Sequence, residues 1–238
     1  MSIIKDKIEE HIVKNSVTDE LQSGFSKGSR IENNIFILKY CRAENQKAKK
    51  MLVLLSIDYK KAFDSINRKE LIKTLKEYGI AENIIDIIAR IYKNDLTYVH
   101  LREDLIEKME IGNGIRQGCT GSSVLFKLVT YMIIKGIQKE CYGFQNEKFK
   151  INCLFFADDS LIMEENMNNM KRTLRITTEL SNEYGLELNK NKCKILVFNR
   201  KTEIKDLDGI EVVNEIKYLG FTINNKKNMF LNHKEKLI

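Results

Sequence analysis

Three aspartates stand where the packing of a hydrophobic core would not by itself put them. Asp58 follows the apolar run Leu52–Ile57, and Asp158 and Asp159 are adjacent between two further apolar segments. Neighbouring carboxylates repel each other and lose hydration when protein surrounds them, and a bound cation relieves both costs. If the three side chains converge, they suit a pair of Mg²⁺ ions about 3.5–4 Å apart, which catalyse in-line phosphoryl transfer.

Each aspartate also has a purely structural interpretation. Asp is a favoured residue in β-turns. A solvent-facing turn therefore explains Asp158 and Asp159 no less well than a catalytic role. For Asp58 alone, the end of a strand is the simpler explanation. The metal site is favoured only because one chain contains both segments.

The pattern of apolar residues predicts the elements that would position these carboxylates. Helical spacing is present over residues 3–15, 67–78, 82–92, 122–139 and 167–184. Asn67 is suited to cap its helix, and Gly79 and Gly185 to end theirs. Short apolar or alternating runs predict strands over 51–57, 151–156, 161–163, 194–198, 210–213 and 216–223, and a hairpin over 95–101 and 104–110. Hairpins outnumber strand–helix–strand units, so we predict an α+β fold.

Composition and charge exclude several classes of protein. The chain has 238 residues, 43% of them hydrophobic, and a formal net charge of +7, which argues against intrinsic disorder. It has no proline, which excludes collagen-like and proline-rich chains. It also has no apolar run of about 18 residues that could cross a membrane. The sequence pI near 9.0 is compatible with nucleic acid as a partner.

The five cysteines are widely spaced and form no Cys-x-x-Cys pair, and the chain has only three histidines. This argues against a zinc site or a disulfide framework. Reduced thiols in an intracellular protein are the favoured interpretation, with nucleus and cytoplasm both open.

Six motifs, in order, resemble those of the reverse transcriptases of non-LTR (LINE-type) retrotransposons. They are Gln-Ser-Gly-Phe-Ser-Lys-Gly at 22–28, Ser-Ile-Asp-Tyr-Lys-Lys-Ala-Phe-Asp-Ser-Ile at 56–66, Gly-Ile-Arg-Gln-Gly-Cys at 114–119, Phe-Ala-Asp-Asp at 156–159, Gly-Leu-Glu-Leu-Asn through Lys-Cys-Lys at 185–194, and Tyr-Leu-Gly at 218–220. Any one motif is weak, whereas the ordered set, from about residue 22 to residue 223, is specific. Group II intron reverse transcriptases share much of this set and remain an alternative.

The resemblance implies a right-hand polymerase with fingers and palm, the palm being an antiparallel sheet backed by helices with a ferredoxin- or RRM-like core. It places residues 1–50 and about 67–112 in the fingers or the fingers–palm junction, and residues 51–66 and 113–223 mainly in the palm. We expect the thumb to be absent, with residues 224–238 forming the start of a truncated connection to it. The implied activity is RNA-directed DNA polymerisation, in which dNTPs are added to a DNA primer on an RNA template, with no membrane involved.

The resemblance also implies roles for individual residues. The catalytic and metal-binding set is Asp58, Asp158 and Asp159, for two Mg²⁺ ions or, alternatively, Mn²⁺. The residues implied to bind the dNTP are Tyr59, Phe63, Gln117, Gly118 and Lys192. Those implied to contact template or primer are Lys27, Arg30, Arg116, Tyr218, Leu219 and Gly220.

Several of these residues have a plain alternative. Phe63 would exclude a 2′-OH as a steric gate, whereas without its neighbouring motif the favoured interpretation is packing on the buried face of a short helix. Lys192 would neutralise or protonate the leaving pyrophosphate, or would be a surface lysine. Lys27 and Arg30 would contact template phosphate, or would form a solvated face.

The sequence departs from the family pattern in two places. Thr120 and Ser123 stand where relatives carry proline, and we expect Thr120 or Ser122 to cap the following helix instead. The resemblance also implies an upstream finger segment with a triphosphate-binding arginine, and we expect no residue of this sequence to take that role. A non-catalytic nucleic-acid-binding remnant therefore stays open as an alternative function, while Phe63 and the Ala-Asp-Asp turn disfavour an RNA-dependent RNA polymerase.

Overall fold

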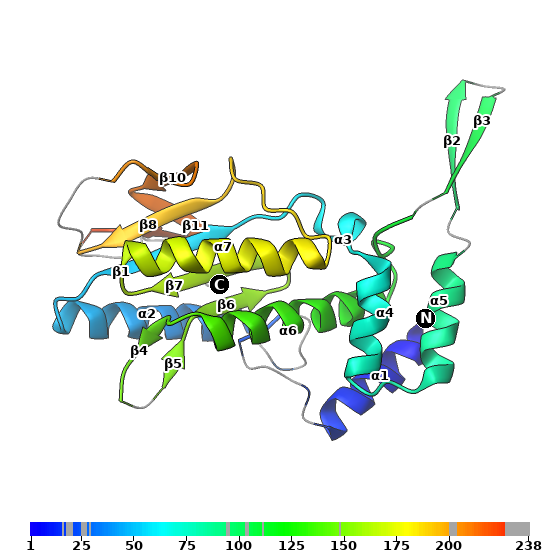
Figure 1. Ribbon diagram of the computed structural model, residues 1–238, viewed down its shortest axis with the longest axis horizontal. Helices are drawn as coiled ribbons and strands as arrows, with labels where there is room; N and C mark the ends of the chain where they lie inside the picture. The colour runs from blue at the N-terminus through cyan, green and yellow to red at the C-terminus, as the bar shows by residue number, and fades with distance from the viewer. Residues whose placement is uncertain are drawn as a thin grey trace, which may run out of the picture.

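The computed structural model describes residues 1–15, 17, 21–24, 28, 30–93, 96–102, 105–110, 112–147, 149–199 and 204–226, with backbone alone for 96–102 and 105–110. Its centre is a six-stranded sheet in the order β6-β7-β1-β8-β10-β9 (Figure 1). The strands are β1 (Leu52–Ile57), β6 (Cys153–Phe156), β7 (Asp159–Glu164), β8 (Lys194–Phe198), β9 (Asp206–Leu207) and β10 (Ile210–Val213). All neighbours pair antiparallel except β8 and β10, which are parallel.

Four of these strands and two helices form the predicted palm core. The chain runs β1, α6 (Ser122–Glu140), β6, β7, α7 (Met167–Glu183) and β8, and the strands lie in the order β6-β7-β1-β8. The two helices pack against each other. A βαββαβ unit with this strand order is the ferredoxin- or RRM-like arrangement, so the predicted α+β fold with an antiparallel sheet backed by helices is confirmed.

The sheet is buried on both faces, because alternate residues of a strand point to opposite sides. Val53, Leu55 and Ile57 of β1 join the core formed with α6 and α7. Leu52 and Leu54 join a second core. That second core is completed by α2 (Ile31–Lys47) and by the hairpin of β11 (Glu215–Tyr218) and β12 (Phe221–Asn224). Burial on both faces explains why β1 is an unbroken apolar run rather than an alternating one.

The helices α1 (Ser2–Lys14), α4 (Arg68–Glu77) and α5 (Glu82–Lys93) lie together at one end of the molecule, and the short helix α3 (Ala62–Ser65) joins them to β1 (Figure 1). The Asn67 side chain accepts hydrogen bonds from the amides of Lys69 and Glu70, which confirms the predicted cap of α4. The hairpin of β2 (Leu96–Arg102) and β3 (Leu105–Glu110) projects away from this end.

The structure differs from the sequence-based prediction in a few elements. The range 216–223, predicted as one strand, is the β11–β12 hairpin, because Leu219 and Gly220 both adopt positive φ and turn the chain. Helix α2 was not predicted, since its buried face carries the polar residues Asn34, Arg42 and Asn45. The short strands β4 (Phe144–Gln145), β5 (Lys150–Ile151) and β9 were also missed. No helix in the described part of the chain is long and apolar enough to span a membrane.

Candidate active site

The three aspartates come together because two central strands end beside each other. The pairing of β1 with β7 runs up to Ile57 opposite Ser160, and the next residues on the two strands are Asp58 and Asp159. Asp158 lies in the two-residue turn that joins β6 to β7, since Phe156 pairs directly with Asp159. The turn is therefore tighter than the sequence suggested, and Asp159 is the first residue of a strand rather than part of the turn.

The electrostatics of Asp159 show that the three carboxylates interact. Desolvation is the largest cause that raises the pKa of its carboxyl, and the charges of Asp158 and then Asp58 raise it further. The side chain is exposed by surface area, yet the protein around it removes enough hydration to disfavour the ionised form. The site thus concentrates negative charge that a cation would neutralise.

The donor chemistry fits divalent metal ions, although the described side chains do not form a ready-made cage. Among them, no group of three His, Cys, Asp or Glu residues is arranged to hold a metal ion. Carboxylate oxygens are the ligands that Mg²⁺ prefers, and Mg²⁺ is commonly held by one or two carboxylates together with substrate phosphates and water. Asp58 and Asp158 supply such oxygens at the strand end and the hairpin turn.

The segment before β8 fixes the backbone of Asp58. The Asn189 amide donates to the Asp58 carbonyl at 2.8 Å, and the Asp58 amide donates to the sulfur of Cys193 at 3.4 Å. Lys192 Nζ lies 3.7 Å from Asp58 Oδ2. The structure therefore brings Lys192 to Asp58, and about two-thirds of the lysine side chain stays exposed.

A cavity of about 550 Å³ opens beside the residues that follow Asp58. Its lining residues are Tyr59, Lys60, Lys61, Asp64, Ser65, Gly185, Glu187, Asn189 and Lys192. Lys60 is paired with Glu187 at 2.5 Å. None of the three aspartates lines this cavity, but Lys192 lines it and lies 3.7 Å from Asp58 Oδ2. The cavity presents lysine side chains, so it has the chemistry to receive phosphate groups.

The surroundings of Phe63 combine features of a packing residue and of a steric gate. It is partly buried on α3, and its ring stacks on that of Phe126 of α6 with centroids 4.6 Å apart and planes 7° apart. Its carbonyl accepts a hydrogen bond from the Ile115 amide at 2.8 Å. The ring is therefore held in one orientation and is not fully enclosed.

The glycine-rich loop of residues 112–121 is pinned to α3. Gln117 Nε2 donates to Asp64 Oδ1 at 3.1 Å, so the structure places Gln117 at the same edge as Phe63. A side chain on Gly114 would collide with the carbonyl oxygen of Asp64, which explains the glycine there. Gly118 has φ +77° and open space around its Cα, so the backbone there is accessible to a ligand.

Arg68 supports this loop, although no sequence motif singled it out. Its Nε donates to the Gly114 carbonyl at 2.7 Å and its Nη1 to the Tyr92 carbonyl at 2.8 Å. Its guanidinium also lies 4.8 Å from the centre of the Tyr92 ring. The only sequence signal was its place directly after the capping residue Asn67.

The Tyr59 side chain does not face the site. It is 7% exposed, and its hydroxyl lies 3.1 Å from the Ser181 hydroxyl of α7. Burial raises the pKa of this phenol, which stays neutral. Of the residues expected to contact the dNTP, Tyr59 therefore offers only its backbone.

The hairpin β11–β12 is anchored through Tyr218. The Tyr218 hydroxyl donates to the Leu154 carbonyl at 3.3 Å and accepts from Asn34 Nδ2 at 3.1 Å, and burial raises its pKa. The ring is thus a buried anchor, and Leu219 and Gly220 form the turn that faces outward, with Gly220 exposed.

Of the remaining residues expected to contact nucleic acid, two are exposed and one lies outside the described part of the chain. Arg30 is exposed and precedes α2, whereas Lys27 lies outside the described residues. Arg116 is exposed on the glycine-rich loop, and its carbonyl accepts a hydrogen bond from the Ser122 hydroxyl at 2.6 Å. The expectation that Thr120 or Ser122 caps α6 is wrong, because Gly121 occupies the cap position and Ser122 bonds back to the loop.

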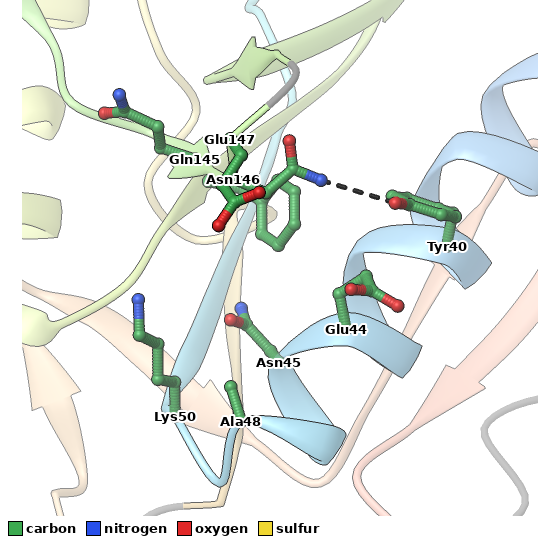
Figure 2. A pocket seen from close by; sticks show the side chains of 9 residues that line it. Tyr40, Glu44, Asn45, Ala48, Lys50, Gln145, Asn146 and Glu147 are labelled. Carbon is green, nitrogen blue, oxygen red and sulfur yellow. Dashed lines mark hydrogen bonds between the residues drawn. The ribbon is translucent and has the colours of Figure 1, made fainter.

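A second hollow, of about 420 Å³, lies between the C-terminal end of α2 and the β4–β5 hairpin (Figure 2). Tyr40 and Asn146 are hydrogen-bonded across it, and Glu44, Glu147 and Lys50 give it mixed charge. None of the residues in the six sequence motifs lines this hollow. The candidate active site is therefore the group of carboxylates at the strand ends and not this hollow.

Comparison with known proteins gives a consistent picture. Residues 1–223 match the family model described as reverse transcriptase (RNA-dependent DNA polymerase). The Pol polyprotein from type-1 retrotransposable element R2 of Popillia japonica is 28% identical over 211 residues, covering 82% of this chain and 34% of the relative. The corresponding protein of the type-2 element R2DM of Drosophila melanogaster is 26% identical over 175 residues, covering 74% and 16%. The chain thus spans about a third or less of these relatives.

Solved structures of telomerase from Candida tropicalis share the fold. One, in complex with a fragment of telomeric RNA, gives a TM-score of 0.72 at 14% identity and covers 100% of this chain and 38% of the telomerase chain. Another, without RNA and truncated from the C-terminal domain, gives a TM-score of 0.69 at 15% identity, with 94% and 44% covered. This likeness shows that the chain has the right-hand polymerase fold.

Proposed function

Since the chain belongs to the reverse transcriptase family, we propose that it adds dNTPs to the 3′-OH of a DNA primer under the direction of an RNA template, as part of a non-LTR retrotransposon polymerase. The observation that carries the proposal is the convergence of Asp58, Asp158 and Asp159 at the ends of β1, β6 and β7. Phosphoryl transfer needs little covalent chemistry from a protein and depends on positioning and charge stabilisation, which this arrangement supplies.

Asp58 and Asp158 would hold two Mg²⁺ ions, or Mn²⁺, with Asp159 completing the carboxylate set. The metal ions would supply charge neutralisation at the reacting phosphate and at the attacking and leaving oxygens. The raised pKa of Asp159 supports this assignment, because a site that holds three interacting carboxylates is stabilised when a cation binds.

The cavity beside Asp58 would receive the triphosphate. Lys192, 3.7 Å from Asp58 Oδ2, would move toward the leaving pyrophosphate and neutralise or protonate it. The backbone of Tyr59 lies at the wall of the same cavity. These placements support Lys192 as a catalytic group rather than a surface lysine.

Phe63, Gln117 and Gly118 would surround the nucleoside. The stack on Phe126 gives the Phe63 ring a fixed plane, which a steric gate needs if it is to exclude a 2′-OH. Gln117 is oriented by Asp64, and the open backbone at Gly118 would allow close approach of the base pair.

The nucleic acid would lie along the face that carries the primer-grip turn and the glycine-rich loop. Leu219 and Gly220 would contact the primer, with Tyr218 as their buried anchor. Arg116, Arg30 and Lys27 would contact template phosphates through charge. We assign residues 51–66 and 113–223 mainly to the palm and residues 1–50 and about 67–112 to the fingers and their junction, although α2 packs on the palm sheet.

The proposal is tested with the purified chain on a poly(rA) template with an oligo(dT) primer, comparing dTTP with UTP in Mg²⁺. Template-dependent incorporation of dTTP and discrimination against UTP are the expected results. Equal use of both nucleotides would contradict the steric-gate role of Phe63. Binding of the duplex without incorporation would assign the chain as a nucleic-acid-binding remnant.

A further inference from the structure

The turn that carries two of the three carboxylates has an unusual backbone. Ala157, the first residue of the two-residue turn between Phe156 and Asp159, has φ +58°. A residue with a Cβ adopts this left-handed conformation at a cost, and glycine is the usual residue at such positions. Its N–H and C=O lie outside the β6–β7 ladder, so the turn needs partners elsewhere to keep this geometry.

Both of these partners come from one side chain, 135 positions away in the sequence. Gln22 Oε1 accepts from the Ala157 amide at 3.2 Å, and Gln22 Nε2 lies 3.4 Å from the Ala157 carbonyl oxygen, to which it donates. The same amide group donates to Thr130 Oγ1 of α6 at 3.0 Å and accepts from the Gly24 amide at 2.9 Å. Gln22 is 1% exposed, so these bonds are shielded from water.

The backbone around Gln22 is itself fixed against β6. The Phe155 amide donates to the Leu21 carbonyl at 2.7 Å, and the Ser23 amide donates to the Phe155 carbonyl at 2.9 Å. A side chain on Gly24 would collide with the backbone nitrogen of Ala157, which shows how closely this segment approaches the turn. Residues 21–24 therefore extend the sheet edge up to the catalytic turn and deliver the Gln22 amide to it.

We propose that Gln22 is a positioning residue that fixes the backbone of Ala157 and thereby sets where Asp158 and Asp159 place their carboxylates. In this role Gln22 contacts neither substrate nor metal. It acts through the turn, in the way that residues hydrogen-bonded to metal ligands orient those ligands. The expected effect on kcat rests on the proposed polymerase function, whereas the expected effect on the Ala157 backbone does not.

The test compares Gln22→Met, which removes all of these hydrogen bonds at similar size, with Ser23→Ala as a matched control. Ser23 is also buried and in the same segment, and its hydroxyl bonds to Asn34 Oδ1 at 2.9 Å without touching the turn. We expect both variants to lose stability. Only Gln22→Met should lower kcat for dTTP incorporation and raise the Mg²⁺ concentration for half-maximal rate, each by about 10–100-fold. Its KM for dTTP and its affinity for the primer–template should match those of Ser23→Ala.

A second measurement separates this inference from the proposed function. Hydrogen exchange of the Ala157 amide, followed by NMR without metal, should be slow in the wild type and in Ser23→Ala and fast in Gln22→Met. This difference in exchange rate is expected even if the chain does not polymerise. If Gln22→Met does not fold, Gln22→Glu keeps the acceptor oxygen and should retain protection of Ala157. The inference is overturned if the Ala157 amide exchanges at the same rate in Gln22→Met and Ser23→Ala, or if it loses protection in a folded Gln22→Glu. It is also overturned if the wild type is active and Gln22→Met has the same kcat and the same Mg²⁺ dependence.

Discussion

Asp58 directly follows Ile57, and Asp159 directly precedes Ser160, where Ile57 and Ser160 are the final pair between two neighbouring antiparallel strands. Their proximity is thus set by strand register and not by a flexible loop. A slip of one residue in this pairing would turn every side chain of β1 to the other face of the sheet. Backbone pairing of β1 with both β7 and β8 holds the carboxylates in place while they repel one another.

Divalent metal should stabilise the folded chain through these carboxylates. Addition of Mg²⁺ at ten times its dissociation constant should contribute about 1.4 kcal/mol, which corresponds to a rise in Tm of roughly 3–6 °C. Differential scanning fluorimetry measures the shift. The rise should be absent in Asp58→Asn, and an equal rise in that variant would place the metal elsewhere.

Without bound metal, repulsion among the three carboxylates should destabilise the folded chain. Because the folded pKa of Asp159 is raised, the ionised form is disfavoured in the folded state at pH values above that pKa. Asp159→Asn should therefore have a higher Tm than the wild type at neutral pH in EDTA. The gain should begin to shrink as pH falls through the folded pKa and should be lost below the ordinary pKa of an aspartate, where the carboxyl is protonated in both the folded and the unfolded chain. A gain that persists unchanged at acid pH would mean that charge is not its cause.

Phe63 should control the choice of sugar. Phe63→Val shortens the side chain that stacks on Phe126, which should open space for a 2′-OH. We expect the ratio of kcat/KM for dTTP over UTP to fall toward one, with little change in the use of dTTP. Single-nucleotide extension assays with each substrate measure this, and an unchanged preference would favour the packing interpretation of Phe63.

Lys192 should act in the chemical step. Lys192→Met removes the ammonium group near Asp58 and should lower kcat by about 10²-fold, the low end of the contribution of a general acid. Lys190→Met is the matched control. It removes a lysine two residues away whose Nζ donates to the Asp208 carbonyl at 3.1 Å. Similar losses in both variants would show that a general loss of positive charge, and not the position of Lys192, is responsible.

The local part of this architecture could be predicted from the sequence. The strand before Asp58, the cap at Asn67 and the hairpin at Asp158 follow from short-range patterns of apolar, capping and turn residues. The resemblance to a polymerase family supplied the expectation that the aspartates converge. Strand register, which brings Asp58 beside Asp159, is a property of the folded sheet.

The long-range contacts could not be predicted in this way. Helix α2 was missed because Asn34 is buried, and its partner Tyr218 lies far along the chain. Gln22 carried no role until its contacts with Ala157 were seen. The burial of the Tyr59 side chain could not be predicted either, since the Ser181 hydroxyl that its own hydroxyl contacts lies on α7. In each case the deciding partner is distant in sequence.

The most direct test of the account is the rate of dTTP incorporation on poly(rA)·oligo(dT) in Mg²⁺ by the wild-type chain and by Asp58→Asn, with primer–template binding measured in parallel. We predict template-dependent extension by the wild type and a loss of at least about 10²-fold in kcat for Asp58→Asn, with unchanged binding of the duplex. Extension at the wild-type rate by Asp58→Asn, or duplex binding without extension by the wild type, would contradict the assignment of these carboxylates to catalysis.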